Sequence, residues 1–268
     1  MKTMPLAPYQ VVAFNTAHDS ENKIHDDATA RRFGFGGGLV PGVDVYAYMT
    51  HLPVAHWGRA WLEHGIAECR FFKPVYDGDT VTVTATETAD GLDIAVESRG
   101  ALCATGRASL PAVPAPSPRL DAFPRVPQRS ERPPADEASL AADTWLGIDP
   151  YPITAEAAAR YLADAHESLP IYAEEALIHP RDILRGGNFV LSRNVVLGPW
   201  IHVGSRIRHL ATARVGARLS VRAHVTGNYE HKGHRFVELD ALVLADDARP
   251  IAHLAHTAIY RPRQVIAA

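Results

Sequence analysis

The sequence is poor in cysteine, has no long apolar run and carries no large excess of one charge. Only two cysteines, Cys69 and Cys103, occur in 268 residues, too few for a disulfide framework or a thiolate metal site. No stretch approaches the roughly 20 apolar residues that cross a bilayer, and residues 1–10 lack the basic-then-apolar order of a signal peptide. The formal net charge of −3 gives no reason to expect nucleic-acid binding. We therefore expect a cytoplasmic protein that binds neither membranes nor nucleic acid.

Proline is concentrated in one segment, which divides the chain. Between Pro111 and Pro134, eight of 24 residues are proline, and such a segment favours extended backbone over a continuous hydrogen-bonded ladder. We assign residues 1–112 to an N-terminal half, 113–137 to a proline-rich linker and 138–268 to a C-terminal half.

The N-terminal half changes from a helical period to a period of two. Residues 42–51 have the pattern of a helix, which Pro53 should end or kink, and residues 56–63 can resume it. Strand-like alternation follows at residues 66–72, 80–88, 92–98 and 101–110.

The C-terminal half repeats this order of one helix and then a sheet. It has a helical pattern at residues 155–165 and, after irregular sequence, strands around 203–210, 218–227, 235–245 and 251–260. Residues 75–83 can be laid over 213–221, and residues 23–27 over 170–174. Since one such unit leaves an apolar sheet face to bury, we expect the two units to pack together. Two independent domains on a flexible tether are the alternative.

One loop of the N-terminal half carries the residue types of acid–base chemistry. A polar segment, residues 20–27, holds His25 and several carboxylates, and it leads through glycine-rich residues 34–42 into the predicted helix. Histidine moves protons near neutral pH, and a helix N-terminus offers free N–H groups to a developing oxyanion. A lone loop histidine is more often a surface hydrogen-bonding group, and a glycine run can be a plain turn.

These residues resemble a family motif. The motif Asp-x-Asn-Pro-x-His-x-Asp, with a later His-Gly that opens a helix, is typical of the MaoC-like (R)-specific enoyl-CoA hydratases, and Asn22, His25, Asp27 and Gly42 fit it. The resemblance covers the N-terminal half and is fainter in the C-terminal half. It implies an α+β double hotdog fold, in which two antiparallel sheets each wrap a central helix and form a pseudo-dimer in one chain.

The resemblance also implies roles for residues. His25 would transfer protons, Asn22 and Asp27 would support the loop and substrate, and the Gly42 N–H would stabilise an enolate. The C-terminal half would accommodate the acyl chain. Residues expected to contact the substrate are Gly38, Val40, Pro41, Arg32, Lys73 and Tyr172, the last standing opposite His25 in the repeat.

The sequence departs from the motif at three positions. Ser20 stands where the family has its catalytic Asp, Pro41 replaces the His of the His-Gly pair, and Lys23 replaces the motif proline. Serine cannot serve as a carboxylate base. A displaced carboxylate, Asp19 or Asp26, could replace the missing one.

The leading prediction is a hydratase or dehydratase acting on an enoyl or 3-hydroxyacyl thioester of coenzyme A or a carrier protein. A hotdog thioesterase and a non-catalytic acyl-thioester binding or assembly protein are the alternatives. We expect no metal, since the 14 histidines form no compact ligand cluster, and no other cofactor. A homodimer is left open.

Overall fold

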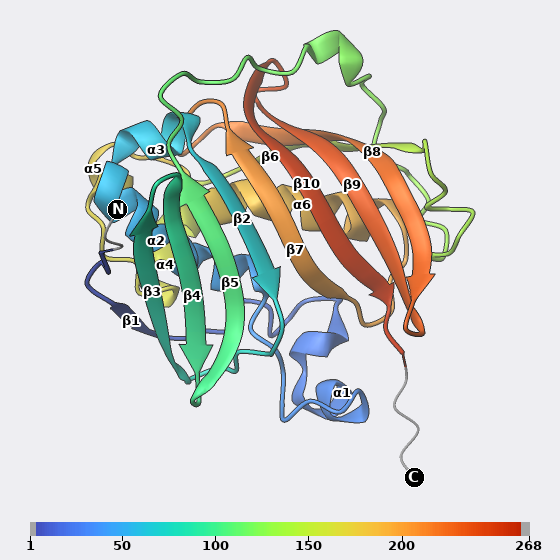
Figure 1. Ribbon diagram of the computed structural model, residues 1–268. Coiled ribbons are helices and arrows are strands. Elements are labelled where there is room, and N and C mark those ends of the chain that lie inside the picture. Colours follow the sequence, from blue (N-terminus) through green and yellow to red (C-terminus); the bar gives the residue numbers. More distant parts are fainter. Residues whose placement is uncertain (1–3, 264–268) are drawn as a thin grey trace.

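The computed structural model describes residues 4–263. Its ten strands form one antiparallel sheet in the order β1-β3-β4-β5-β2-β7-β10-β9-β8-β6 (Figure 1). Counted inward from each edge, the five strands of the two halves follow the same order. The strands are β1 (Tyr9–Val12), β2 (Ile66–Phe71), β3 (Thr80–Thr88), β4 (Gly91–Ser98), β5 (Ala101–Ser109), β6 (Trp145–Pro152), β7 (Ile201–His209), β8 (Arg218–His231), β9 (His234–Ala245) and β10 (Arg249–Arg261).

The two halves meet where β2 pairs with β7. Ala67 lies opposite Ile207, and Cys69 lies opposite Ser205. A single cluster of buried apolar side chains includes residues from both halves. The alternative of two tethered, independent domains is therefore wrong, because main-chain hydrogen bonds and a common core join the halves.

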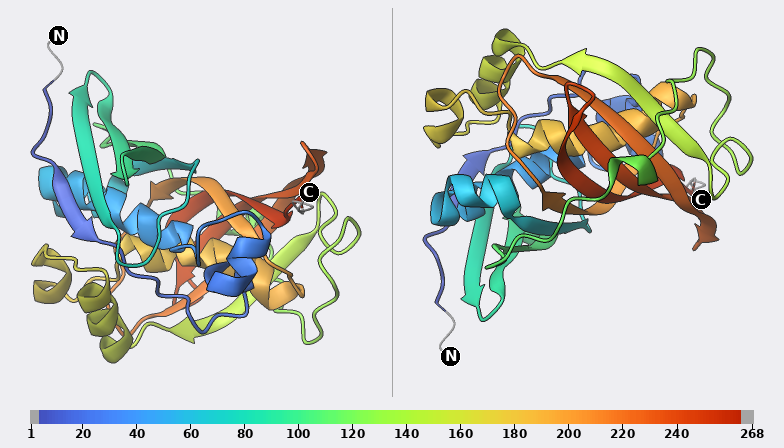
Figure 2. Two further views of the ribbon diagram at one scale, coloured as in Figure 1. Left: turned by 90° about the horizontal axis from the view of Figure 1, so that it is seen from below. Right: turned by 90° about the horizontal axis from the view of Figure 1, so that it is seen from above.

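Two long helices, α2 (Gly42–Trp57) and α6 (Pro180–Asn194), lie against the same face of the sheet (Figures 1 and 2). Each belongs to one half and contacts the other helix. The core consists of the apolar side chains enclosed between these two helices and the sheet. The shorter helices are η1 (Lys23–His25), α1 (Asp27–Arg32), α3 (Arg59–His64), η2 (Leu120–Ala122), α4 (Ala155–Asp164) and α5 (Ile171–Glu174).

Helix α2 continues through Pro53 to Trp57, so this proline does not end the helix. Residues 43–50 and 52–54 are all buried. Proline removes one intrahelical hydrogen bond, but packing on nearly every side of α2 outweighs that loss. The helix ends at Gly58, whose φ of 60° suits glycine.

The central helix of the C-terminal half is α6, not the helix predicted at residues 155–165. That predicted helix exists as α4, capped by the Thr154 side chain, but it lies outside the central position. Sequence reasoning missed α6 because it contains Gly186 and Gly187, which weaken a helix in isolation. Their role is close packing: an added Cβ would lie 2.9 Å from Val221 at the first and 2.9 Å from His256 at the second.

Equivalent hydrogen bonds confirm that the halves repeat. The Val40 N–H donates to the Val75 carbonyl in one half, and the Ile178 N–H donates to the Ala213 carbonyl in the other. This agrees with the overlay of residues 75–83 on 213–221. The overlay of residues 23–27 on 170–174 is one residue out, because the Leu39 N–H donates to Ile24 and the Leu177 N–H donates to Tyr172. Tyr172 thus matches buried Ile24 rather than His25.

The proline-rich segment is largely irregular and runs over the surface of the C-terminal half (Figure 1). It is packed rather than loose. Phe123 is buried against Leu242 and Leu244, and the Arg129 guanidinium donates to the carbonyls of Asn194 and Ser139. The segment therefore contributes to the packing of the half that follows it.

Candidate active site

The loop between β1 and α2 is held in shape by side chains of its own. Asp26 caps α1 by accepting the Thr29 N–H at 2.9 Å. Asp27 Oδ1 accepts the Gly38 N–H at 2.8 Å, so Asp27 supports the loop, as its place in the motif predicts. These bonds fix residues 22–27 beside the segment that enters α2.

His25 has a defined tautomer. Its Nδ1 lies 2.6 Å from the Leu39 carbonyl, which can only accept, so Nδ1 carries the proton and Nε2 has the lone pair. Burial lowers the pKa of His25, which the Leu39 bond and the negative charge of Asp44 partly counteract. The imidazole is therefore neutral at neutral pH and can act as a base through Nε2.

Asn22 ties the histidine loop to the C-terminal half. Its Nδ2 donates to the Trp200 carbonyl at 3.0 Å, and its Oδ1 accepts the Trp200 N–H at 3.2 Å. The same Nδ2 lies 3.4 Å from His25 Nε2. Because Trp200 immediately precedes β7, this side of the site is built from both halves.

The segment from Gly38 to Pro41 brings the loop to the helix. A Cβ at Gly38 would lie 2.2 Å from the His25 carbonyl oxygen, so only glycine fits beside His25 here. Val40 is buried and bonded to the strand region through Val75. Pro41 occupies the N-cap position of α2 and offers no side-chain cap.

Gly42 opens α2 with a free donor. Its N–H donates to no residue among residues 4–263, as expected for the first turn of a helix. A Cβ at Gly42 would lie 3.0 Å from Nδ1 of His202 and 3.1 Å from the Phe71 ring. The start of α2 therefore faces β7 and the end of β2.

Neither displaced carboxylate meets His25. Asp19 is exposed, Asp26 caps α1, and the Ser20 hydroxyl donates to the Asn22 carbonyl at 3.2 Å. The carboxylate whose charge acts on His25 is Asp44, which the sequence analysis missed. Its position in the first turn of α2 was the available signal.

Asp44 is fully buried and paired. Its Oδ2 accepts the Thr16 hydroxyl at 2.6 Å, and its Oδ1 accepts Arg181 Nε at 2.9 Å. Arg181 also bonds Asp182 at 2.8 Å. Both oxygens of this carboxylate accept hydrogen bonds from protein groups, so it is a poor candidate for a water-activating base.

The other residues predicted to contact the substrate differ in burial. Arg32 and Lys73 are exposed. Tyr172 is a core residue at 1% exposure, tilted against His179 with ring centroids 4.6 Å apart. Its ring is enclosed in the packing of the C-terminal half, and its contact with the substrate stays a prediction.

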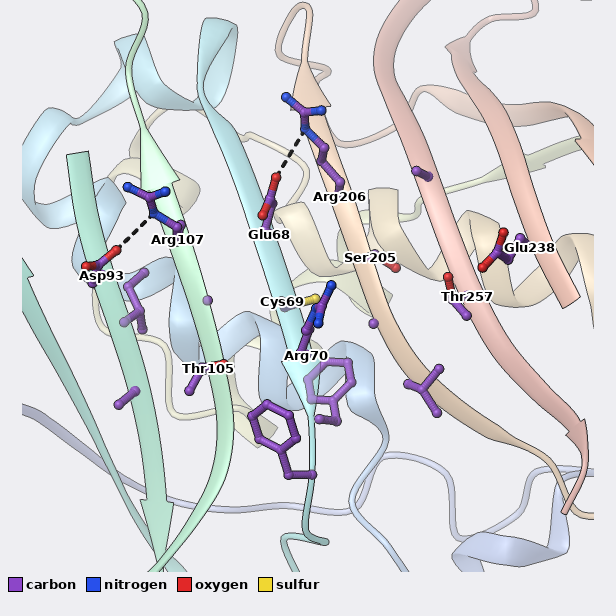
Figure 3. Close-up of a pocket in the computed structure, with 18 of the residues that line it drawn as sticks. Glu68, Cys69, Arg70, Asp93, Thr105, Arg107, Ser205, Arg206, Glu238 and Thr257 are labelled. Atoms are coloured by element: carbon purple, nitrogen blue, oxygen red, sulfur yellow. Dashed lines mark hydrogen bonds and ion pairs between the residues drawn. The ribbon is translucent and has the colours of Figure 1, made fainter. Parts of the chain in front are cut away.

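A groove of about 990 Å³ lies on the other face of the sheet. Figure 3 shows Glu68, Arg70, Arg107 and Arg206 on the face turned away from the helices. The ion pairs of Arg107 with Asp93 and of Arg206 with Glu68 cross it. His25 and Gly42 do not line this groove.

Within residues 4–263, no group of three or more His, Cys, Asp or Glu side chains is arranged to hold a metal ion. Over the same part of the chain, no helix is long and apolar enough to cross a membrane. Both cysteines are buried free thiols.

Comparison with known proteins identifies the architecture. The family model described as MaoC like domain matches residues 1–99, and no curated protein matches the sequence. A MaoC domain dehydratase from Chloroflexus aurantiacus shares 13% identity at a TM-score of 0.62, covering 97% of this chain and 95% of that one. A conserved protein of Mycobacterium tuberculosis with a double hotdog fold shares 17% identity at a TM-score of 0.66, and the match covers 96% of this chain and 95% of that one.

A thioesterase-like protein from Novosphingobium aromaticivorans has the same architecture. It shares 14% identity at a TM-score of 0.56, covering 96% of each chain. Both activities therefore occur in the descriptions of proteins that share this fold, so the fold alone does not select between them. The chain has a double hotdog fold, and residues 1–99 of its N-terminal half match the model of the MaoC like domain.

Proposed function

We propose that this chain is a hydratase or dehydratase acting on an enoyl or 3-hydroxyacyl thioester of coenzyme A or of a carrier protein. The supporting observation is the 2.6 Å hydrogen bond from His25 Nδ1 to the Leu39 carbonyl. It leaves a neutral imidazole with a lone pair on Nε2, and it ties the ring to the segment that enters α2 at Gly42, whose N–H is free among the described residues.

The chemistry needs those two parts. As the water oxygen bonds to Cβ of the enoyl thioester, Nε2 of His25 takes the water proton. The electron pair of the double bond moves to the thioester oxygen as an enolate, which the Gly42 N–H stabilises. The proton on His25 then goes to Cα, so that one base serves both transfers. Dehydration is the reverse sequence.

Hydrolysis of the thioester is the second candidate. Hotdog thioesterases use a carboxylate and a bound water, and the carboxylate available to His25, Asp44, is bound by Thr16 and Arg181. That pairing favours hydration by His25 over hydrolysis by Asp44. Neither reaction requires a metal or redox cofactor, and a coenzyme A substrate fits a cytoplasmic location.

Crotonyl-CoA separates these activities in one experiment. Hydration lowers the absorbance of the conjugated enoyl group without releasing thiol, whereas hydrolysis releases free coenzyme A thiol. We expect the first signal. Thiol release alone would support the thioesterase, and calorimetric binding of acyl-CoA with neither signal would support a non-catalytic binding protein.

A further inference from the structure

A β-bulge in β7 places two polar side chains on the same side of the strand. Thr257 of β10 pairs with Gly204, but the next residue, Ala258, pairs with His202. Val203 is therefore an extra residue. Since side chains alternate along a strand, the extra residue turns both His202 and Ser205 toward the helices.

These two side chains join His256 in a hydrogen-bonded chain. His202 Nε2 lies 2.8 Å from the Ser205 hydroxyl, which lies 2.9 Å from His256 Nδ1. The two imidazole rings also stack, with centroids 4.3 Å apart. Burial lowers the pKa of His202 far below its usual value and that of His256 to about 4. Both rings are neutral at physiological pH.

One hydroxyl proton links the tautomers of the two rings. If Ser205 donates to His202, it accepts from His256, and the free atoms are the His202 Nδ1–H and the lone pair of His256 Nε2. The opposite arrangement would leave an unpaired N–H on His256, which is 1% exposed in the core. Each arrangement has one unpaired N–H, and the first places it on His202, which is 7% exposed and borders the start of α2, where a bound ligand can accept it. The first arrangement is therefore preferred.

The free His202 Nδ1–H points to the start of α2. Within residues 4–263 this atom has no hydrogen-bond partner, although His202 is only 7% exposed. It lies 3.0 Å from where a Cβ of Gly42 would stand. Two unpaired donors, the His202 Nδ1–H and the Gly42 N–H, thus meet at the positive end of a 16-residue helix.

We propose that His202 is the second donor of the oxyanion site, binding the thioester carbonyl oxygen together with the Gly42 N–H. Ser205 and His256 are positioning residues that hold His202 in the donating tautomer. A neutral imidazole suits this role, because it donates a hydrogen bond without adding a positive charge to the helix N-terminus. The inference rests on the proposed function, and it assigns this contact to a residue of the C-terminal half.

The test compares His202→Phe with His209→Phe. Both are buried histidines of β7, but His209 packs on Trp61 with ring centroids 4.9 Å apart, away from Gly42. In crotonyl-CoA hydration we expect His202→Phe to lower kcat by about 10²–10³-fold with a small change in KM, the loss typical of removing one oxyanion donor. His209→Phe should keep the wild-type kcat. Ser205→Ala should give an intermediate loss, which covers the case in which His202→Phe does not fold.

A spectroscopic readout separates this inference from the proposed reaction. Infrared spectroscopy of bound butyryl-CoA should show a thioester carbonyl stretch at lower frequency in wild type than in His202→Phe. Equal frequencies and equal kcat in the two phenylalanine variants would overturn the role of His202 while leaving hydration intact. A carbonyl shift without hydration would support the donor and reject the reaction. Absence of butyryl-CoA binding by wild type would overturn both.

Discussion

Arg181 Nε lies 2.9 Å from Asp44 Oδ1, so a buried ion pair joins the first turns of α2 and α6. Arg181→Met would leave the Asp44 carboxylate buried with only Thr16 as partner. Removing one member of a buried pair typically costs about 3–5 kcal/mol, and we expect a loss of that size in the free energy of unfolding measured by urea denaturation.

An exposed pair gives the matched control. Arg107→Met removes the ion pair between Arg107 and Asp93, two side chains that are each more than half exposed. Its loss should lower the free energy of unfolding by less than about 1 kcal/mol. Equal losses for the two variants would show that the Asp44–Arg181 pair does not join the halves in the way described.

Gly38 controls the position of His25. In Gly38→Ala the new Cβ would overlap the His25 carbonyl oxygen, at 2.2 Å, so the loop must move. Since a displacement of about 1 Å can cost about 10²-fold in rate, hydration should fall by about that factor. Gly198→Ala, where a Cβ would meet no atom within 4 Å, is the control. Undiminished hydration in Gly38→Ala would mean that this contact does not position His25.

Part of this architecture could be predicted from sequence. The alternation of apolar and polar residues after residue 66 predicts strands that are buried on one face. The turn at Gly78 matches the turn at Gly216, and the two glycines have φ values of 75° and 98°. Helix α6 could not be predicted in the same way. Its glycines and charged first turn are explained only by contacts with distant residues, such as His256 and Asp44.

In the candidate site too, some features could be predicted from local sequence and others depend on contacts between distant residues. The spacing of Asn22, His25 and Asp27 predicts one loop, and the three residues do lie together in it. No local pattern could indicate His202, because its orientation depends on a one-residue shift between β7 and β10. Nor could spacing show that Asp44, rather than Asp19 or Asp26, is the carboxylate that acts on His25.

His209 makes the protein sensitive to acid. Burial lowers its pKa to about 4, whereas in the unfolded chain it titrates near 6.5. Its contribution to stability is therefore full above pH 6.5, falls as the pH drops from 6.5 to 4, and is constant below. That change is worth roughly 3 kcal/mol, at 1.36 kcal/mol per pH unit between the two pKa values.

His209→Phe should remove the contribution of His209 to this sensitivity, while buried His202 and His256 keep theirs. Both ring nitrogens of His209 lack partners within the described residues, so we expect the variant to be more stable at pH 8 by about 1–3 kcal/mol. Its advantage should increase at pH 5. Urea denaturation at the two pH values measures both effects, with exposed His56→Gln as the control. An advantage that shrinks on acidification would contradict the assignment.

His25 is the residue that we propose performs the acid–base chemistry at the start of α2. The most direct test follows the loss of enoyl absorbance from crotonyl-CoA for wild type and His25→Ala, with thermal unfolding of both proteins as the check on folding. We predict hydration by wild type and a rate at least about 10²-fold lower in the variant, with a stability loss of only about 1 kcal/mol from the missing bond to Leu39. A folded His25→Ala protein that hydrates crotonyl-CoA at the wild-type rate would contradict the claim.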